Sequence, residues 1–460
     1  MNKGFQTIGN AIIICYDQNP ILITDPWIKG SAYFGSWVLS HEIPEEQMEA
    51  ILESEYIWLS HGHPDHLHSN SIDILNDKKI LLPNHYGGRI YYELKEKGYN
   101  VNILEDGMWV NLSNNIKIMC ISDYNQDAIL LIDINGILLI NINDASDRAW
   151  GGYVRKITKE YKISFLLSLS GYGDADMINY FNNDGDRILP NGGEKKPFGR
   201  SIVRLTEKIG AKFFIPFSSM HKYQRTDSIW VNKWTTDISD YSKGFKSDKC
   251  EILPAYISYD CISDMFEKIN PKEVKIMPVE PIEFGDAWDE PLENSDLNKI
   301  KEYFGKISHL RKVLSFINFK IANKDNFIDI NPNLSDKGIT FEVPRNSLMK
   351  AIDFEIFDDL LIGNFMKTTI HGNWSNTKKL YPEFTPYVSK YADNAQVKSK
   401  IELSNYFKEY QKRALLNFVR NPFEINSKKA IRLFLPPDSI VYRSGDIAFR
   451  AAKKIQRMIQ

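Results

Sequence analysis

The chain has 460 residues, of which 43% are hydrophobic and 25% charged, and its formal net charge is -2. The length predicts two domains, or one large domain and an appendage. This composition is typical of a folded globular protein. It excludes a strongly basic protein that binds nucleic acid through its overall charge.

The four cysteines are scattered along the chain, and no CxxC pair occurs. We therefore expect a reducing compartment and no zinc or iron–sulfur site held by cysteines. The apolar run near the N-terminus, AIIIC (11–15), is too short for a signal peptide or a membrane anchor. No later segment approaches the ~18 unbroken apolar residues of a membrane-spanning helix. The expected location is cytoplasmic.

Short strands are predicted through the first part of the chain. Segments rich in β-branched residues and bounded by turn residues lie at 10–16, 20–27, 56–60, 79–84, 115–122, 128–134 and 137–142. The last two surround Asn135-Gly136, a dipeptide that favours a two-residue hairpin. Helices are predicted at 44–54 and 88–98. Strands with helices among them indicate an α/β or α+β fold.

The same pattern continues with a strand at 163–170, a helix at 201–211 and a strand at 212–217. The segment 276–294 combines three prolines with acidic residues, which is typical of a linker. Helical periodicity beyond it, at 295–317 and 397–419, predicts a mostly helical C-terminal region. We place the boundary near residue 285, which gives two domains, 1–285 and 286–460.

A cluster of histidines follows the predicted strand 56–60 directly. Its order is His61-Gly-His63-Pro-Asp65-His66. Alternate residues of an extended segment face one side, so His61 and His63 can bind one metal ion, while Asp65 and His66 can turn to a second. A polar loop with local hydrogen bonds is the alternative. Three histidines and an aspartate in this order favour the metal site.

Further ligands are expected at the ends of other strands. Asp25 could orient a ligand histidine through its carboxylate, or it could be a turn residue before Pro26. Asp144 suits a carboxylate that bridges two cations. His221 is the candidate for a late histidine ligand, although alone it would be read as an ordinary loop histidine.

These residues together resemble the metallo-β-lactamase superfamily. Within it, four segments are similar to the catalytic part of the CMP-N-acetylneuraminate hydroxylases, with ascorbate-6-phosphate lactonases and N-acyl-phosphatidylethanolamine phospholipases nearby. The segments are ITDPWIKGSAYFGSWVLSHEIP, WLSHGHPDHLHSNSI, ILLININDAS and IMPVEPIEFGDAWDEP. The resemblance implies a four-layer αββα sandwich with a dinuclear metal site at one edge, followed here by the mostly helical C-terminal region.

Two departures from the family pattern affect the expected chemistry. The hydroxylases carry a Rieske domain with paired Cys/His ligands, and this sequence has no such pair. The superfamily's further ligand histidine is also missing from CISDYNQDAILLI (120–132), where Asp123 is the nearest substitute. The equal alternative is that Asp123 caps a turn. The implied metal ligands are His61, His63, Asp65, His66, Asp123, Asp144 and His221, and the expected cofactors are two divalent ions of iron, manganese or zinc.

A dinuclear site of this kind lowers the pKa of a bridging water and binds the oxygens of a phosphoester, lactone or amide. Asp65 could then take the proton of the water, and His221 could stabilise the developing charge. The first prediction is a hydrolase of a small phosphorylated or nucleotide-linked anion. The alternatives are a di-iron oxygenase that receives electrons from a separate protein, and a binding protein without activity.

Candidate substrate-binding residues lie in loops expected at the same face: Trp27, His41, His85 and Lys222. Each has a simpler alternative, as core aromatic, loop histidine or solvated lysine. We expect no nucleic acid partner, and the sequence leaves the oligomeric state open.

Overall fold

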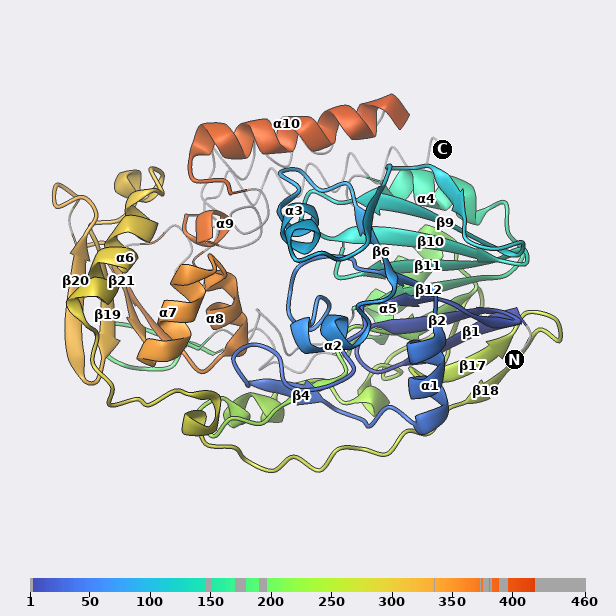
Figure 1. Cartoon of the computed structure of the whole chain (residues 1–460), viewed down its shortest axis with the longest axis horizontal. Coiled ribbons are helices and arrows are strands. Elements are labelled where there is room, and N and C mark those ends of the chain that lie inside the picture. Colours follow the sequence, from blue (N-terminus) through green and yellow to red (C-terminus); the bar gives the residue numbers. More distant parts are fainter. Residues whose placement is uncertain are drawn as a thin grey trace.

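The computed structural model describes residues 3–145, 150–169, 179–189, 197–334, 336–372, 374, 380, 383–388 and 396–417. Two large sheets pack against each other, a smaller sheet with its own helices lies beside them, and a long helix runs past both parts (Figure 1).

The first large sheet is mixed. Strands from the N-terminal hairpins pair antiparallel, whereas β3, β5, β6 and β7 pair parallel. In spatial order the strands are β18 (Met265–Lys268), β17 (Ile257–Asp260), β1 (Lys3–Ile8), β2 (Ile12–Asp17), β3 (Asn19–Thr24), β5 (Tyr56–Trp58), β6 (Lys79–Pro83) and β7 (Val101–Leu104).

The second large sheet is also mixed, with β11, β12, β14 and β16 parallel. Its order is β16 (Glu251–Ile252), β14 (Phe213–Pro216), β12 (Ser164–Ser168), β11 (Ile137–Asn143), β10 (Ala128–Ile134), β9 (Ile116–Ser122) and β8 (Trp109–Asn111). The predicted hairpin joins β10 to β11. Asn135 and Gly136 have φ values of 52° and 84°, the left-handed backbone that an Asn-Gly turn supplies with little strain.

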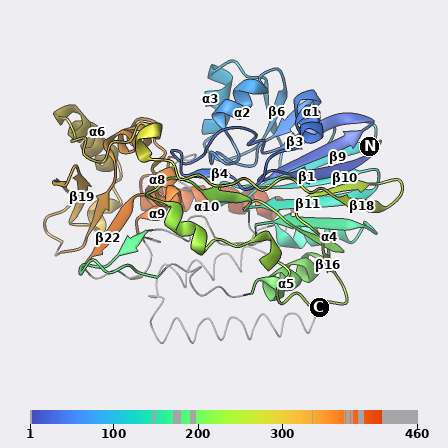
Figure 2. The same ribbon diagram turned by 90° about the horizontal axis from the view of Figure 1, so that it is seen from below.

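Four layers result, and they confirm the predicted αββα sandwich. One apolar core fills the space between the sheets, with Phe5 and Trp58 from the first sheet against Leu130 and Phe165 from the second. Helices cover both outer faces, as Figure 2 shows. They are α1 (Glu45–Glu53), α2 (Ser69–Ile74) and α3 (Arg89–Glu96) on the first sheet, and α4 (Gly151–Thr158) and α5 (Gly199–Ile209) on the second.

The described part of the region beyond residue 285 combines helices with a sheet that the prediction of a mostly helical region did not include. The sheet order is β13 (Tyr180–Phe181), β22 (Lys367–His371), β21 (Gly338–Glu342), β19 (Phe316–Ile321) and β20 (Lys324–Asp329). The predicted helix at 295–317 ends at Gly305, and its last residues already belong to β19. Apolar residues in short runs fit a strand as well as a helix, and the sheet partner decides.

Helices flank this third sheet and share one core with it. They are α6 (Asn294–Gly305), α7 (Arg345–Asp353), α8 (Phe357–Gly363), α9 (Thr385–Val388) and the long α10 (Lys400–Asn417). β13 comes from the first part of the chain and pairs with β22, so the two parts are interleaved. Residues 418–460 of the predicted second domain lie outside the described residues. None of the helices in the described part of the chain combines the length and the apolarity that crossing a bilayer requires.

Candidate metal centre

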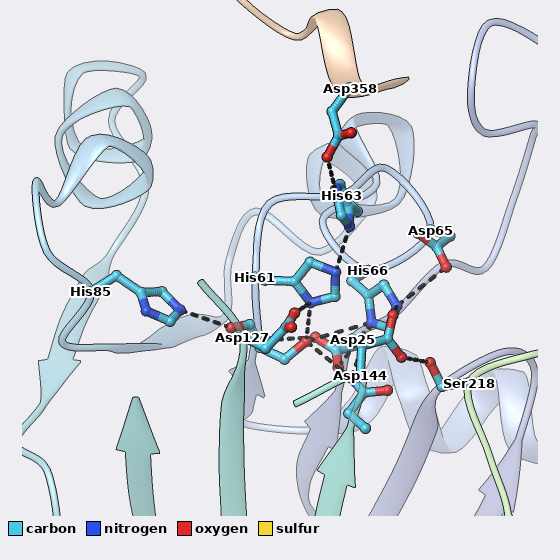
Figure 3. A network of polar contacts seen from close by, with 12 residues as sticks. Asp25, His61, His63, Asp65, His66, His85, Asp127, Asp144, Ser218 and Asp358 are labelled. Carbon is cyan, nitrogen blue, oxygen red and sulfur yellow. Dashed lines mark hydrogen bonds and ion pairs between the residues drawn. The ribbon is translucent and has the colours of Figure 1, made fainter. Parts of the chain in front are cut away.

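Parallel strands of both large sheets end at the same edge of the sandwich, and charged residues follow them. Asp25 comes directly after β3, and Asp144 comes directly after β11. His61 lies three residues beyond the end of β5. Figure 3 shows these side chains converging on one space. These candidate residues therefore follow the ends of strands, where a rigid scaffold commonly presents functional groups.

The loop after β5 folds back on itself and turns its histidines toward one another. The backbone amides of His66 and Leu67 donate to the carbonyl of His63 at 2.9 and 2.8 Å. His61 Nε2 lies 2.9 Å from His63 Nδ1. Two ring nitrogens that face each other this closely can bind one cation between them, as the alternation of the sequence predicts.

His66 faces two carboxylates. Its buried Nε2 lies 3.2 Å from Asp65 Oδ2 and 3.6 Å from Asp144 Oδ2. Ligand atoms of His61, His66 and Asp144 all lie within 4.8 Å of one another, a spacing that suits a single ion. Nitrogen and oxygen donors in this combination suit zinc, iron or manganese.

The nitrogen of each histidine that points away from the centre meets a carboxylate. His66 Nδ1 lies 3.2 Å from Asp25 Oδ2, and His61 Nδ1 lies 3.2 Å from Asp127 Oδ1. His63 Nε2 donates to Asp358 Oδ2 at 3.2 Å. Metal-binding histidines in proteins almost always donate their second nitrogen in this way, which fixes the ring and raises its basicity.

Asp25 is held rigidly for such a role. Its carboxylate accepts the backbone amide of Ser60 at 2.7 Å and the side-chain amide of Asn143 at 2.7 Å. Asp25 and Asn143 both have positive φ, 39° and 52°. Strained backbone of this kind is concentrated at functional sites. Asn143 is a site residue that the sequence analysis missed, because nothing distinguishes it from other polar residues at strand ends.

Asp65 is held in place by two hydrogen-bond donors. The hydroxyl of Tyr33 donates to it at 2.6 Å and the amide of Asn10 at 3.0 Å. Burial alone would raise the pKa of Asp65, but the charge of His66 and these hydrogen bonds lower it. A strongly ionised carboxylate suits a metal ligand better than a proton acceptor. Asn10 sits in the turn between β1 and β2 and gave no signal in the sequence.

The charges around the centre call for a cation. Burial alone would lower the pKa of His66. The carboxylates of Asp65, Asp25 and Asp144 instead raise it well above its usual value. Asp358 likewise raises the pKa of His63 to about 10 against the effect of burial. The carboxylates around His63 and His66 thus favour positive charge at this centre, which metal ions would supply. The donor set therefore fits a metal centre.

The loop between β9 and β10 carries Asp123, whose role as a metal ligand stays a prediction, and Asp127, which the sequence analysis did not single out. Asp123 and Asp127 close this turn, with the amide of Asp123 donating to the carbonyl of Asp127 at 2.8 Å. The carboxylate of Asp123 accepts the amide of Tyr124 at 2.8 Å, as a turn cap does. Asp127 is the residue that reaches His61. The sequence offered both aspartates, and only the turn geometry separates them.

His221 lies in the short strand β15 (His221–Tyr223), which pairs with β4 (Trp37–Leu39). Its ring is buried and lies flat on Trp37, with centroids 3.4 Å apart and planes 3° apart. The hydroxyl of Ser218, three residues earlier, donates to Asp144. His221 is not among the three residues whose ligand atoms cluster, so its role as a ligand stays a prediction.

The predicted substrate-binding residues fall in different environments. Trp27 is fully buried and donates its indole N–H to the carbonyl of Gly30, and its contact with a substrate stays a prediction. His41 hydrogen-bonds Ser40 at 2.9 Å and lies edge-on to Tyr256.

Lys222 alternates with the buried His221 along β15 and therefore points to the opposite face. His85 lies nearest to the centre. Its Nε2 donates to the carbonyl of Ser60 at 3.1 Å, and its Nδ1 meets the hydroxyl of Tyr410 on α10 at 3.3 Å.

No protein-family model matches the chain. The curated relatives are cytidine monophosphate-N-acetylneuraminic acid hydroxylases. The protein from Danio rerio is 27% identical over 233 residues, which are 47% of this chain and 38% of that protein. The protein from Asterias rubens is 27% identical over 136 residues, 28% of this chain and 21% of that protein. The Homo sapiens protein, described as inactive, is 26% identical over 224 residues, 47% of this chain and 44% of that protein.

Solved structures with a similar arrangement are more distant in sequence. Igni18, a metallo hydrolase from Ignicoccus hospitalis, is 13% identical with a TM-score of 0.35 and covers 56% of this chain and 97% of its own. CmlA, a diiron β-hydroxylase from Streptomyces venezuelae, is 10% identical with a TM-score of 0.37 and covers 58% of this chain and 54% of its own. The chain spans less than half the length of the curated relatives named above. Over about half of its own length it is similar to CMP-N-acetylneuraminic acid hydroxylases, as its histidine motif predicts.

Proposed function

We propose that this chain is a metal-dependent enzyme, and that it hydrolyses a small anionic substrate through water activated by two metal ions. One observation carries the proposal. His61 Nε2, His63 Nδ1 and His66 Nε2 face a common space with Asp65 and Asp144, while the opposite nitrogen of each ring meets a carboxylate. A solvated polar loop would not require a carboxylate at the outer nitrogen of each of three histidine rings.

The ligand atoms form one continuous group, in which those of His61, His66 and Asp144 lie within 4.8 Å of one another, and we assign them to two adjoining ions. His61 and His63 would hold one ion, with Asp127 orienting the His61 ring. Asp65, His66 and Asp144 would hold the other, with His221 as a further candidate ligand, and Asp25 would orient His66. When bound, such a pair of ions lowers the pKa of a bridging water and polarises the ester, lactone or amide that it attacks.

The chain's own groups would then manage protons and orientation. Asp144 has a partly exposed carboxylate and accepts a hydrogen bond from Ser218, so it is better placed than Asp65 to exchange a proton with water. Asp65, locked by Tyr33 and Asn10, would serve as a ligand. In this proposal Asp144, and not Asp65 as the sequence analysis suggested, takes the proton of the water.

The sequence relatives support a nucleotide-linked sugar or a similar phosphorylated metabolite as the substrate class, since their names give a cytidine monophosphate sugar. They also support a second candidate function, a di-iron oxygenase that receives electrons from a separate protein. Histidine and carboxylate donors are suited to iron as well as to zinc or manganese. The two candidates share the metal centre and differ in the need for oxygen and electrons.

Metal content tests the proposal directly. We expect about two equivalents of a divalent metal in protein purified without added metal, by elemental analysis. His66→Ala should lose most of this metal. His371→Ala is the matched control, because His371 hydrogen-bonds Thr340 in the third sheet and should leave metal content unchanged. Protein that takes up no metal even after incubation with zinc, manganese and iron(II) would refute both candidate functions.

Activity then separates the candidates. Protein loaded with zinc or manganese should cleave phosphodiesters, lactones or CMP-sugars without oxygen. Turnover that requires iron, oxygen and an added reductant, with none under argon, would replace the hydrolase by the oxygenase.

A further inference from the structure

The helix α8 brings a carboxylate from the C-terminal region to the metal centre. Asp358 lies in its first turn and is 5% exposed. It accepts the hydrogen bond of His63 Nε2 at 3.2 Å, across 295 residues of sequence. Figure 3 shows Asp358 above His63, with His63 between it and His61.

The side of the ring that Asp358 contacts decides the interpretation. His63 Nδ1 faces His61 Nε2, so Nε2 is the nitrogen that points away from the centre. Asp127 contacts the corresponding outer nitrogen of His61, and Asp25 that of His66. The outer ring nitrogen of each of these three histidines therefore contacts an aspartate carboxylate. Two of these partners come from the sandwich, and the third comes from outside it.

We propose that Asp358 is a positioning residue that orients His63 for metal binding, and that the C-terminal region thereby completes the metal centre. This inference rests on the proposed metal-dependent function. A carboxylate at the outer nitrogen holds the ring in one orientation and keeps the proton on Nε2, which leaves the Nδ1 lone pair for the metal.

A purely structural role makes a different prediction. Acidic residues in the first turn of a helix interact favourably with its dipole, and Asp358 and Asp359 both occupy the first turn of α8. On that reading, replacing Asp358 would lower the stability of the protein and leave its affinity for metal unchanged.

The test is a graded series in the full chain. Asp358→Asn keeps an oxygen that accepts a hydrogen bond and removes the charge, whereas Asp358→Ala removes both. Asp353→Asn is the control, because Asp353 lies on α7 and pairs with Lys299 at the surface. Zinc affinity would be measured by competition with a chromophoric chelator, the visible spectrum after loading with cobalt(II), and the melting temperature of the metal-free protein.

We expect the zinc affinity of Asp358→Ala to fall about 10- to 100-fold for one of two equivalents, as replacement of such partners typically does. Asp358→Asn should lose less, and the cobalt spectrum of the Ala variant should change because His63 is no longer held. If both variants bind zinc within twofold of wild type with an unchanged cobalt spectrum, the inference is wrong. Wild-type protein that binds no metal would instead overturn the proposed function, so the two failures are distinguishable.

Discussion

Replacing Arg225 by methionine tests how the segment that carries His221 is joined to the C-terminal region. Arg225 is fully buried. Its guanidinium donates to Asp286 at 2.7 Å, to the carbonyl of Phe34 at 2.8 Å and to both oxygens of Asp227 at 2.9 and 2.8 Å. It also lies 3.9 Å from the centre of the Phe365 ring. One side chain thus links the sandwich, the segment after it and the loop that follows α8.

The cost follows from the charge that remains. Methionine preserves much of the apolar stem but leaves the buried carboxylate of Asp286 without its counter-ion, which costs about 3–5 kcal/mol. Asp286 keeps neutral donors from the amide and hydroxyl of Ser347, at 2.9 and 2.6 Å. These donors place the expected loss of unfolding free energy for Arg225→Met at the lower end, about 3 kcal/mol. Asp286→Asn leaves Arg225 paired with Asp227 and should cost about 1.5–3 kcal/mol.

Urea unfolding of the two single variants and the double variant measures these terms. The double variant should lose less free energy of unfolding than the sum of the single losses, because residue 286 no longer carries a buried charge that lacks its counter-ion. A loss below about 1 kcal/mol for Arg225→Met, or strict additivity in the double variant, would refute the assignment of Arg225 as a buried electrostatic link.

Three further substitutions probe separate parts of the molecule. Asp25→Ala removes the partner of His66 and should weaken zinc binding about 10- to 100-fold in a chelator competition. Tyr410→Phe removes the hydroxyl that meets His85 and accepts the backbone amide of Tyr86, and it should lower the unfolding free energy by about 1–3 kcal/mol in urea, because two hydrogen bonds are lost. Burial, and next the charge of a nearby lysine, lowers the pKa of His309 to about 4. Its neutral form therefore contributes stability that is complete above about pH 6.5 and lost as pH falls towards 4, so His309→Phe should flatten the fall in melting temperature over this range.

A specific result would contradict each of these predictions. Unchanged zinc affinity in Asp25→Ala would mean that His66 is not oriented by that carboxylate. For Tyr410→Phe the exposed Tyr92→Phe is the control, and equal stabilities would show that the Tyr410 hydroxyl does not contribute to holding α10. A His309→Phe protein with the wild-type pH profile would assign the acid sensitivity to other groups.

Local patterns predicted most of the sandwich correctly. The Asn-Gly hairpin, the helices α1, α3 and α5 and the strand before the histidine motif all depend on residues close together in sequence. Hydrophobic periodicity and turn chemistry act over this same range. The metal motif was found for the same reason, since His61, His63, Asp65 and His66 lie within one loop.

The features that the sequence analysis did not predict share a different property. Asp127 and Asp123 sit on opposite sides of one turn, and the register of β9 with β10 decides which of them reaches His61. β19 follows α6 closely in sequence and becomes a strand because β21 lies beside it in parallel. Tertiary context overrides local preference in both cases, and no pattern within one segment carries that information.

The contact between Asp358 and His63 could not be predicted from local sequence patterns, because the two residues lie far apart in the sequence. Joining residues 295 positions apart costs little more chain entropy than joining residues half as far apart, about 0.6 kcal/mol per doubling of the loop. The entropy of closing this loop therefore does not prevent the contact, which requires that the sandwich and the C-terminal region both be folded. The other two carboxylate partners, Asp25 and Asp127, lie within the sandwich and are in place once it has folded. Among the described contacts of these three histidines, it is His63 whose carboxylate partner comes from the C-terminal region. If Asp358 orients His63 as proposed, metal affinity should depend on how the two parts are joined.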